Sequence, residues 1–128
     1  MTEVHARTMC HPTEDRAKVI GGILSIFPGA DVRGEDEIEV TVTSLERFTE
    51  LIARQQIRDA ARSVLRRNIS GGSTTFTLNK QVAAAGRVSF AEEAHPLGDI
   101  HVTIADDDIE ALIDRIAPST RPPRGQSP

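Results

Sequence analysis

The hydrophobic period of this chain switches between that of a strand and that of a helix, and this switch constrains the fold most. From residue 37 to 43, apolar side chains alternate with polar ones, the period of two typical of a half-buried strand. The same alternation runs through 4–10 and 100–104. In 109–116 the apolar residues instead recur at i, i+3, i+4 and i+7, which indicates an amphipathic helix. A chain with both periods buries its apolar faces by packing helices on a sheet.

The full pattern predicts an α+β sandwich with the element order β-α-β-β-α-α-β-β-β-α. We expect one domain over residues 1–118, with a mixed, mostly antiparallel sheet and helices on one face. The tail 119–128 has no apolar residue outside proline and is expected to be disordered. The strands are expected at 4–10, 31–33, 37–43, 74–78, 88–90 and 100–104, with a turn at 70–73, an ambiguous segment at 79–85 and a loop at 92–98.

The helices have expected start signals and one expected break. Thr13 is placed to cap the first helix, and Asp106 or Asp107 to cap the last. The segment 45–68 contains no glycine or proline, but its apolar face turns by roughly 120° along its length on an ideal helical wheel. We therefore expect a break near 54–56.

Composition excludes several classes of protein. The chain has four phenylalanines and neither tryptophan nor tyrosine, so the core must be mainly aliphatic and aromatic base-stacking platforms are nearly excluded. No apolar run reaches the roughly 18 residues of a membrane span. The single cysteine, Cys10, forms no internal disulfide, which favours a cytoplasmic protein.

Charge is distributed unevenly along the chain. The net charge is −4, but residues 1–44 carry −4, residues 45–90 carry +5 and residues 91–128 carry −5. The positive block contains a stripe of arginines at i, i+4 spacing, which lie on one slanted face of a helix. This stripe consists of Arg54, Arg58, Arg62 and Arg66.

Two interpretations of the arginine stripe stay open. Guanidinium forks match phosphate oxygens, so the stripe, with Arg67, Lys80 and Arg87, favours binding to an RNA sugar-phosphate backbone. Alternatively, the arginines pair with acidic side chains of the same domain, or with those of a second copy in a homodimer.

A second polar cluster follows the strand at 74–78. The side chains of Asn79, Lys80 and Gln81 carry amide and ammonium donors that suit phosphates or base edges. An equally weighted alternative is a turn in which Asn79 bonds its own backbone while the following alanines pack on a helix.

Catalytic and metal-binding motifs are not evident. Cys10, His11 and the histidines 5, 95 and 101 lack metal-ligand spacing, and the acids at 106–108 fit a helix start. The glycine-rich segment 70–74 leads into a strand rather than a helix, which argues against a phosphate loop. We expect no catalytic residues, no metal and no cofactor.

Several ordered motifs resemble an archaeal family of small uncharacterised proteins labelled as predicted RNA-binding proteins and, for some members, as candidate exosome-associated subunits. The resemblance runs from about Val4 to Thr120. It is carried by Pro12-Thr13-Glu14-Asp15, Arg54-Gln55-Gln56-Ile57 with Asp59, Ala61 and Arg62, Leu78-Asn79-Lys80-Gln81 with Ala83 and Gly86, Val88-Ser89-Phe90, Pro96-Leu97-Gly98 and Ala117-Pro118.

The resemblance implies a fold similar to that of the ribosomal protein that binds 5S ribosomal RNA, and RNA as a partner. The chain departs from the family at Arg58, where an apolar residue is common, and at 82–85, which often holds an aromatic residue. Together with the stripe, the resemblance predicts a non-catalytic accessory protein that contacts RNA through Arg54, Arg58, Arg62, Arg66, Arg67, Asn79, Lys80, Gln81 and Arg87.

Overall fold

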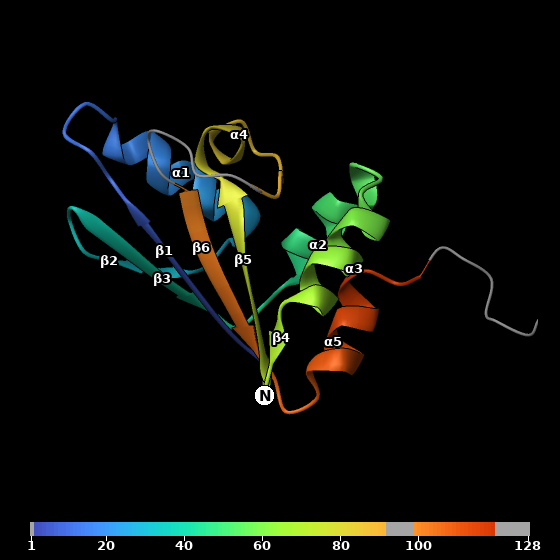
Figure 1. Ribbon diagram of the computed structural model, residues 1–128. Helices are drawn as coiled ribbons and strands as arrows, with labels where there is room; N and C mark the ends of the chain where they lie inside the picture. Colours follow the sequence, from blue (N-terminus) through green and yellow to red (C-terminus); the bar gives the residue numbers. More distant parts are fainter. Residues whose placement is uncertain (1, 92–98, 120–128) are drawn as a thin grey trace, which may run out of the picture.

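The computed structural model describes residues 2–91 and 99–119 and contains one antiparallel sheet with helices packed on it (Figure 1). The strands are β1 (Glu3–Met9), β2 (Asp31–Arg33), β3 (Glu37–Val42), β4 (Ile69–Ser70), β5 (Ser73–Asn79) and β6 (Asp99–Ala105). The helices are α1 (Arg16–Ile26), α2 (Glu46–Arg54), α3 (Arg58–Arg67), α4 (Lys80–Ala84) and α5 (Ile109–Ile116). The strand order is β2-β3-β1-β6-β5-β4, and all neighbouring strands run antiparallel.

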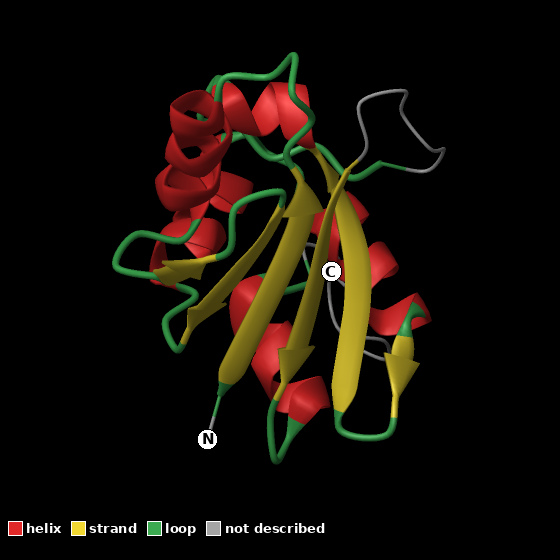
Figure 2. Cartoon of the chain, turned by 90° about the vertical axis from the view of Figure 1, so that its left-hand side faces the viewer, coloured by secondary structure: helices red, strands yellow, loops and turns green. Residues whose placement is uncertain are grey.

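The helices cover one face of the sheet, as the alternation predicts. Along β1, Val4, Ala6 and Thr8 are buried, whereas the intervening His5 and Arg7 are exposed. Figure 1 shows α1 beside α4, and α2, α3 and α5 as a second group. Figure 2, turned by 90° from Figure 1, shows the strands of the sheet in front of most of the helices. The position of α3, packed on β5 and α5, places the arginine-rich segment at the β4–β5 side of the sheet.

The predicted α+β fold class is confirmed, and the element order broadly matches. Three short elements differ from the prediction. Ser70, predicted in the turn at 70–73, forms β4 together with Ile69, and the ambiguous segment contains α4. The strand expected at 88–90 is reduced to a single β-bridge between Phe90 and Leu78. The loop expected at 92–98, and all of the expected tail except Ser119, lie outside the described residues.

The predicted break in the central helical segment is confirmed. The helix α2 ends at Arg54 and α3 begins at Arg58. Between them, Gln56 has a φ of 59°, a left-handed conformation that interrupts helical hydrogen bonding. The two helices can therefore direct their apolar faces to different neighbours.

The residues predicted to cap α1 and α5 were wrong, each by one or two positions in the sequence. Asp15 rather than Thr13 caps α1, because its carboxylate accepts a hydrogen bond from the Ala17 amide at 3.0 Å. Asp108 caps α5 by accepting from the amide of Ala111 at 3.1 Å, whereas Asp106 accepts from the amide of Asp108. In each case, the acidic residue immediately before the helix provides the cap.

The core is mainly aliphatic, but all four phenylalanines form one row through it. Phe27 stacks on Phe48 and Phe48 on Phe76, each pair with ring centroids 5.7 Å apart. Phe76 then meets the half-buried Phe90 edge to face at 5.6 Å. The row thus runs from the core to the surface. Among the described residues, no helix is both long and apolar enough to cross a membrane.

Candidate functional site

The arginines of α3 and its neighbourhood fall into two groups that differ in their partners. Arg58, Arg66, Arg67 and Arg87 are exposed, and among residues 2–91 and 99–119 none of their guanidinium groups has an ion-pair or hydrogen-bond partner. A positive group that lacks a protein partner remains available to an external anion. These four arginines are called the open arginines below.

Arg62, from the middle of the stripe, has protein partners instead. Its guanidinium lies 2.6 Å from the Asp114 carboxylate and donates a second hydrogen bond to the carbonyl of Ala117 at 3.1 Å. Only 22% of the Arg62 side chain is exposed. Arg62 therefore joins α3 to α5. For this arginine, the structure agrees with the interpretation that the stripe pairs with acidic side chains of the same domain.

Arg54 is intermediate between these groups. It pairs with Glu50 at 2.9 Å, and Glu50 also contacts Arg47 at 3.0 Å. The side chain of Arg54 is 68% exposed. Because an exposed pair of this kind contributes little free energy, Arg54 can exchange the carboxylate for another anion at small cost.

The cluster Asn79-Lys80-Gln81 is divided by the start of α4. Asn79 caps this helix, since its side-chain oxygen accepts from the Val82 amide at 2.9 Å. Lys80 is directed inward and is 4% exposed, so it offers no surface to a ligand. Only Gln81 is exposed. The structure thus corrects the expectation that Lys80 forms part of a binding surface, and it favours the turn interpretation for Asn79.

The Lys80 ammonium is buried because it has two acceptors. It donates to the Glu14 carboxylate at 2.8 Å and to the carbonyl of Met9 at 2.7 Å. Burial acts to raise the pKa of Glu14, but the hydrogen bonds from Lys80 and the His11 amide and the charge of Lys80 outweigh it, so this pKa is lowered. The pair links the segment before α1 to α4.

Gln55 determines where the segment 87–91 runs. Its side chain donates to the Val88 carbonyl at 2.8 Å and accepts from the Val88 amide at 2.7 Å. This pair of bonds places Arg87 beside the junction of α2 and α3. Arg87 therefore lies on the side of α3 where Arg58 begins the helix, whereas Arg66 and Arg67 stand at its opposite end.

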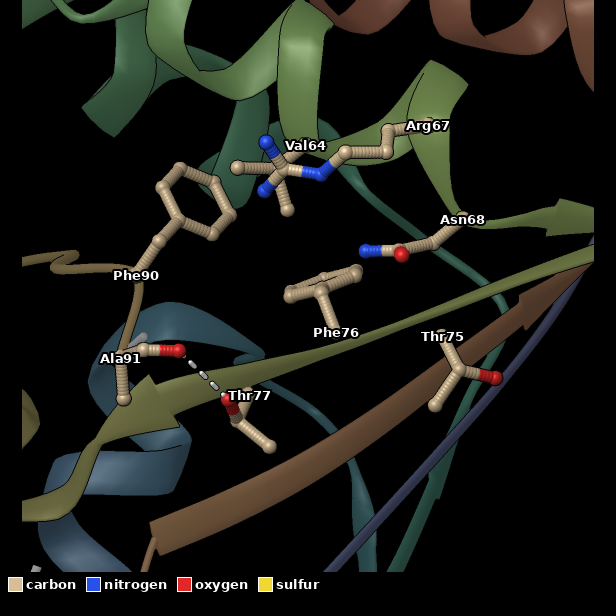
Figure 3. Close-up of a pocket in the computed structure, with 8 residues that line it drawn as sticks. All are labelled: Val64, Arg67, Asn68, Thr75, Phe76, Thr77, Phe90 and Ala91. Atoms are coloured by element: carbon tan, nitrogen blue, oxygen red, sulfur yellow. Dashed lines mark hydrogen bonds between the residues drawn. The ribbon is translucent and has the colours of Figure 1, made fainter. Parts of the chain in front are cut away.

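A cavity of about 480 Å³ lies between α3, the edge of β5 and the segment that ends at Ala91 (Figure 3). Its apolar walls are provided by Val64, Phe76 and Phe90. Figure 3 shows the side chains of Arg67 and Asn68 extending from the end of α3 into this space. The remaining lining residues are Thr75, Thr77 and Ala91.

Asn68 and Phe90, which line this cavity, are not among the residues that the sequence predicts for a binding site. The sequence predicts Phe90 in a strand and Asn68 at the end of a helix, and 21 residues lie between them in the chain. Because they approach each other only through tertiary packing, no local spacing identifies them. Over the described part of the chain, no group of three or more His, Cys, Asp and Glu side chains is placed to hold a metal ion.

Residues 3–105 match a family model described as RNA binding. The UPF0201 protein of Sulfolobus acidocaldarius is 38% identical over 130 residues, which cover 94% of this chain and 90% of that relative. The chain belongs to the UPF0201 family. The resemblance to an archaeal family of proteins with an RNA-binding label is thereby confirmed.

Other UPF0201 proteins match at similar levels. The solved structure of the UPF0201 protein from Methanococcus jannaschii is 40% identical and superposes with a TM-score of 0.85, covering 93% of this chain and 95% of that one. A UPF0200/UPF0201 protein of Archaeoglobus fulgidus is 40% identical over 123 residues. This chain spans only 38% of the length of the Archaeoglobus fulgidus protein.

Proposed function

We propose that this UPF0201 protein binds RNA through its open arginines, as a non-catalytic accessory protein in the cytoplasm. The observation that carries the proposal is the group of four exposed guanidinium groups, Arg58, Arg66, Arg67 and Arg87, which have no partner within the described residues. The family model that matches residues 3–105 supports RNA as the ligand.

The chemistry of the open arginines fits a sugar-phosphate backbone. Each guanidinium presents several N–H donors in a planar fork, which can bind two phosphate oxygens at once. Arg54 adds a fifth contact if it leaves Glu50, and the exposed Gln81 adds an amide. Backbone contacts position an RNA without reading its sequence, so we expect recognition of RNA shape.

A second candidate is self-association, in which the open arginines meet acidic side chains of another copy. Exposed acids gather on β2, β3 and the turn between them, at the opposite end of the strand order from β4. They include Asp31, Glu35, Asp36, Glu37 and Glu39. Since the two charged regions lie far apart in the strand order, contact between them requires a second molecule.

One experiment separates these functions. We propose to titrate a fluorescein-labelled RNA hairpin with the protein at about 50 mM salt, where phosphate contacts are strong, and to follow anisotropy. The test variants are Arg58→Glu and Arg67→Glu. The matched control is Arg33→Glu, which changes the net charge equally but lies on β2, where Arg33 is 80% exposed.

If the open arginines bind phosphate, each test reversal weakens binding by about tenfold or more, whereas Arg33→Glu changes it little. Absence of binding to the hairpin, or equal losses in all three variants, contradicts the proposal. Sizing chromatography of the same samples tests the alternative, because self-association through the arginines predicts that Arg58→Glu releases monomer.

A further inference from the structure

We propose that the cavity between α3, β5 and the segment ending at Ala91 receives one unpaired nucleobase of the bound RNA. This inference rests on the proposed RNA binding and adds a base subsite to it. The first argument is size, since the cavity holds about 480 Å³. Pockets for small organic ligands fall within roughly 300–1,000 Å³, so a base with its ribose fits.

The apolar side of the cavity contains two aromatic rings that stand at 65° to each other, so a base can stack on one of them. Phe90 is half-buried at the outer end of the phenylalanine row, and its ring meets the buried Phe76 at 5.6 Å. Two hydrogen bonds hold this segment in place, because the Ala91 amide donates to the Thr77 carbonyl at 3.0 Å and the Thr77 hydroxyl donates to the Ala91 carbonyl at 2.9 Å. A ring fixed in this way provides one stacking surface formed before the ligand arrives, contrary to the expectation from composition.

The polar side of the cavity matches the edge of a base and its phosphate. The Asn68 amide carries both donors and an acceptor, and within the described residues it has no hydrogen-bond partner. An amide of this kind can pair with the donor and acceptor groups on a base edge. Arg67, the adjacent residue, supplies a positive charge for the phosphate of the same nucleotide.

The combination of these groups favours a nucleotide that is not base-paired. A base in an RNA duplex is stacked and paired, and its edges lie in grooves that exclude such an insertion. An unpaired base in a loop or bulge can leave the stack and present its face to Phe90 and its edge to Asn68. The UPF0201 protein would then prefer RNA with unpaired nucleotides, although the open arginines also bind duplex.

The experiment compares two RNAs, a hairpin with an unpaired loop and a fully paired duplex of equal length, in anisotropy titrations. The variants are Asn68→Ala and Phe90→Leu, which retains an apolar side chain against Phe76. Asn68→Ala removes no side-chain hydrogen bond within the described residues, so we expect this variant to stay folded. It therefore tests the cavity even if the Phe90→Leu protein unfolds. Arg58→Glu serves as the matched comparison, because it alters a backbone contact outside the cavity.

We expect each cavity variant to lose about tenfold in affinity for the hairpin and less than about twofold for the duplex, since stacking and edge contacts require an unpaired base. Arg58→Glu is expected to weaken both. The base subsite is overturned if the cavity variants bind the hairpin as tightly as the unaltered protein, or if they lose equal affinity for both RNAs. In either case the RNA-binding proposal stands. Failure of the unaltered protein to bind either RNA instead overturns the proposed function itself.

An abasic scan of the hairpin loop makes the test position-specific. In the unaltered protein, removal of one particular base is expected to weaken affinity by the same factor as Phe90→Leu. The two changes together should weaken affinity no more than either change alone. Fully independent effects at every loop position contradict the proposal, because two partners in one contact must be coupled.

Discussion

The ammonium of Lys80 lies 2.8 Å from the carboxylate of Glu14 in the protein interior, where the two side chains are 3% and 12% exposed. The contact joins residues 66 positions apart and ties the segment before α1 to the first turn of α4. Because Lys80 is buried in this contact, we expect it to stabilise the fold rather than to bind a ligand, although it stands in a polar motif.

Replacement of Lys80 with methionine is expected to destabilise the fold strongly. The change leaves the Glu14 carboxylate buried without its cation, and loss of one partner from a buried pair costs about 3–5 kcal/mol. Urea denaturation measures the free energy of unfolding. The double variant Lys80→Met/Glu14→Leu should recover part of the loss, and a single-variant loss below about 1 kcal/mol contradicts the structural role.

The same pair predicts a specific dependence of stability on pH. Because the pKa of Glu14 is lowered in the folded state, ionised Glu14 stabilises the fold above its unfolded pKa of about 4.3, and this contribution is lost as the pH falls through the folded value. We therefore expect the stability difference between the unaltered protein and Glu14→Gln to be constant near neutral pH and to shrink in acid. A difference that stays constant down to about pH 3 contradicts this assignment.

Packing of α1 on α4 depends on the small size of Gly22. A Cβ atom at this position would lie 2.8–2.9 Å from backbone atoms of Ala83 and Ala84, which are too close for ordinary contact. We expect Gly22→Ala to destabilise the protein by about 1–3 kcal/mol in thermal or urea unfolding.

The neighbouring glycine provides a matched control for that substitution. Gly21 lies on the same helix, is exposed, and a Cβ there would meet nothing within 4 Å. Gly21→Ala should stabilise the protein by up to about 1 kcal/mol, because alanine favours the helix. Equal effects of the two substitutions would contradict the close helix contact.

Substitutions of Arg62 and Arg58 are expected to affect different properties, stability for Arg62 and RNA binding for Arg58. Arg62→Ala removes the bonds to Asp114 and Ala117, so it should lower the free energy of unfolding by about 1 kcal/mol, given the partial exposure of the pair. Arg58→Ala removes no described contact and should leave stability within about 0.5 kcal/mol while weakening RNA binding. The reverse pattern in paired denaturation and anisotropy measurements would refute this division.

Local patterns predict the regular elements, and tertiary contacts determine most of the site. The strands with a period of two and the break before α3 follow from neighbouring side chains, so the sequence predicts them. The five-residue α4 and the two-residue β4 are too short to show a period. The burial of Lys80 depends on the carboxylate of Glu14, which is 66 positions away in the sequence. The cavity depends on the packing of α3 near Phe90. Neither relationship leaves a signal in local spacing.

The salt dependence of RNA affinity tests the central claim most directly. Each phosphate contact contributes a slope of about −0.7 to a plot of log affinity against log salt for single-stranded RNA, so Arg58→Ala/Arg67→Ala should make the slope shallower by about 1.4. The control Arg16→Ala/Arg33→Ala should retain the slope of the unaltered protein, because Arg33 lies on β2, at the other end of the strand order, and Arg16 donates a hydrogen bond to the Gly34 carbonyl just after β2. A slope that is unchanged in Arg58→Ala/Arg67→Ala would contradict RNA binding by the open arginines.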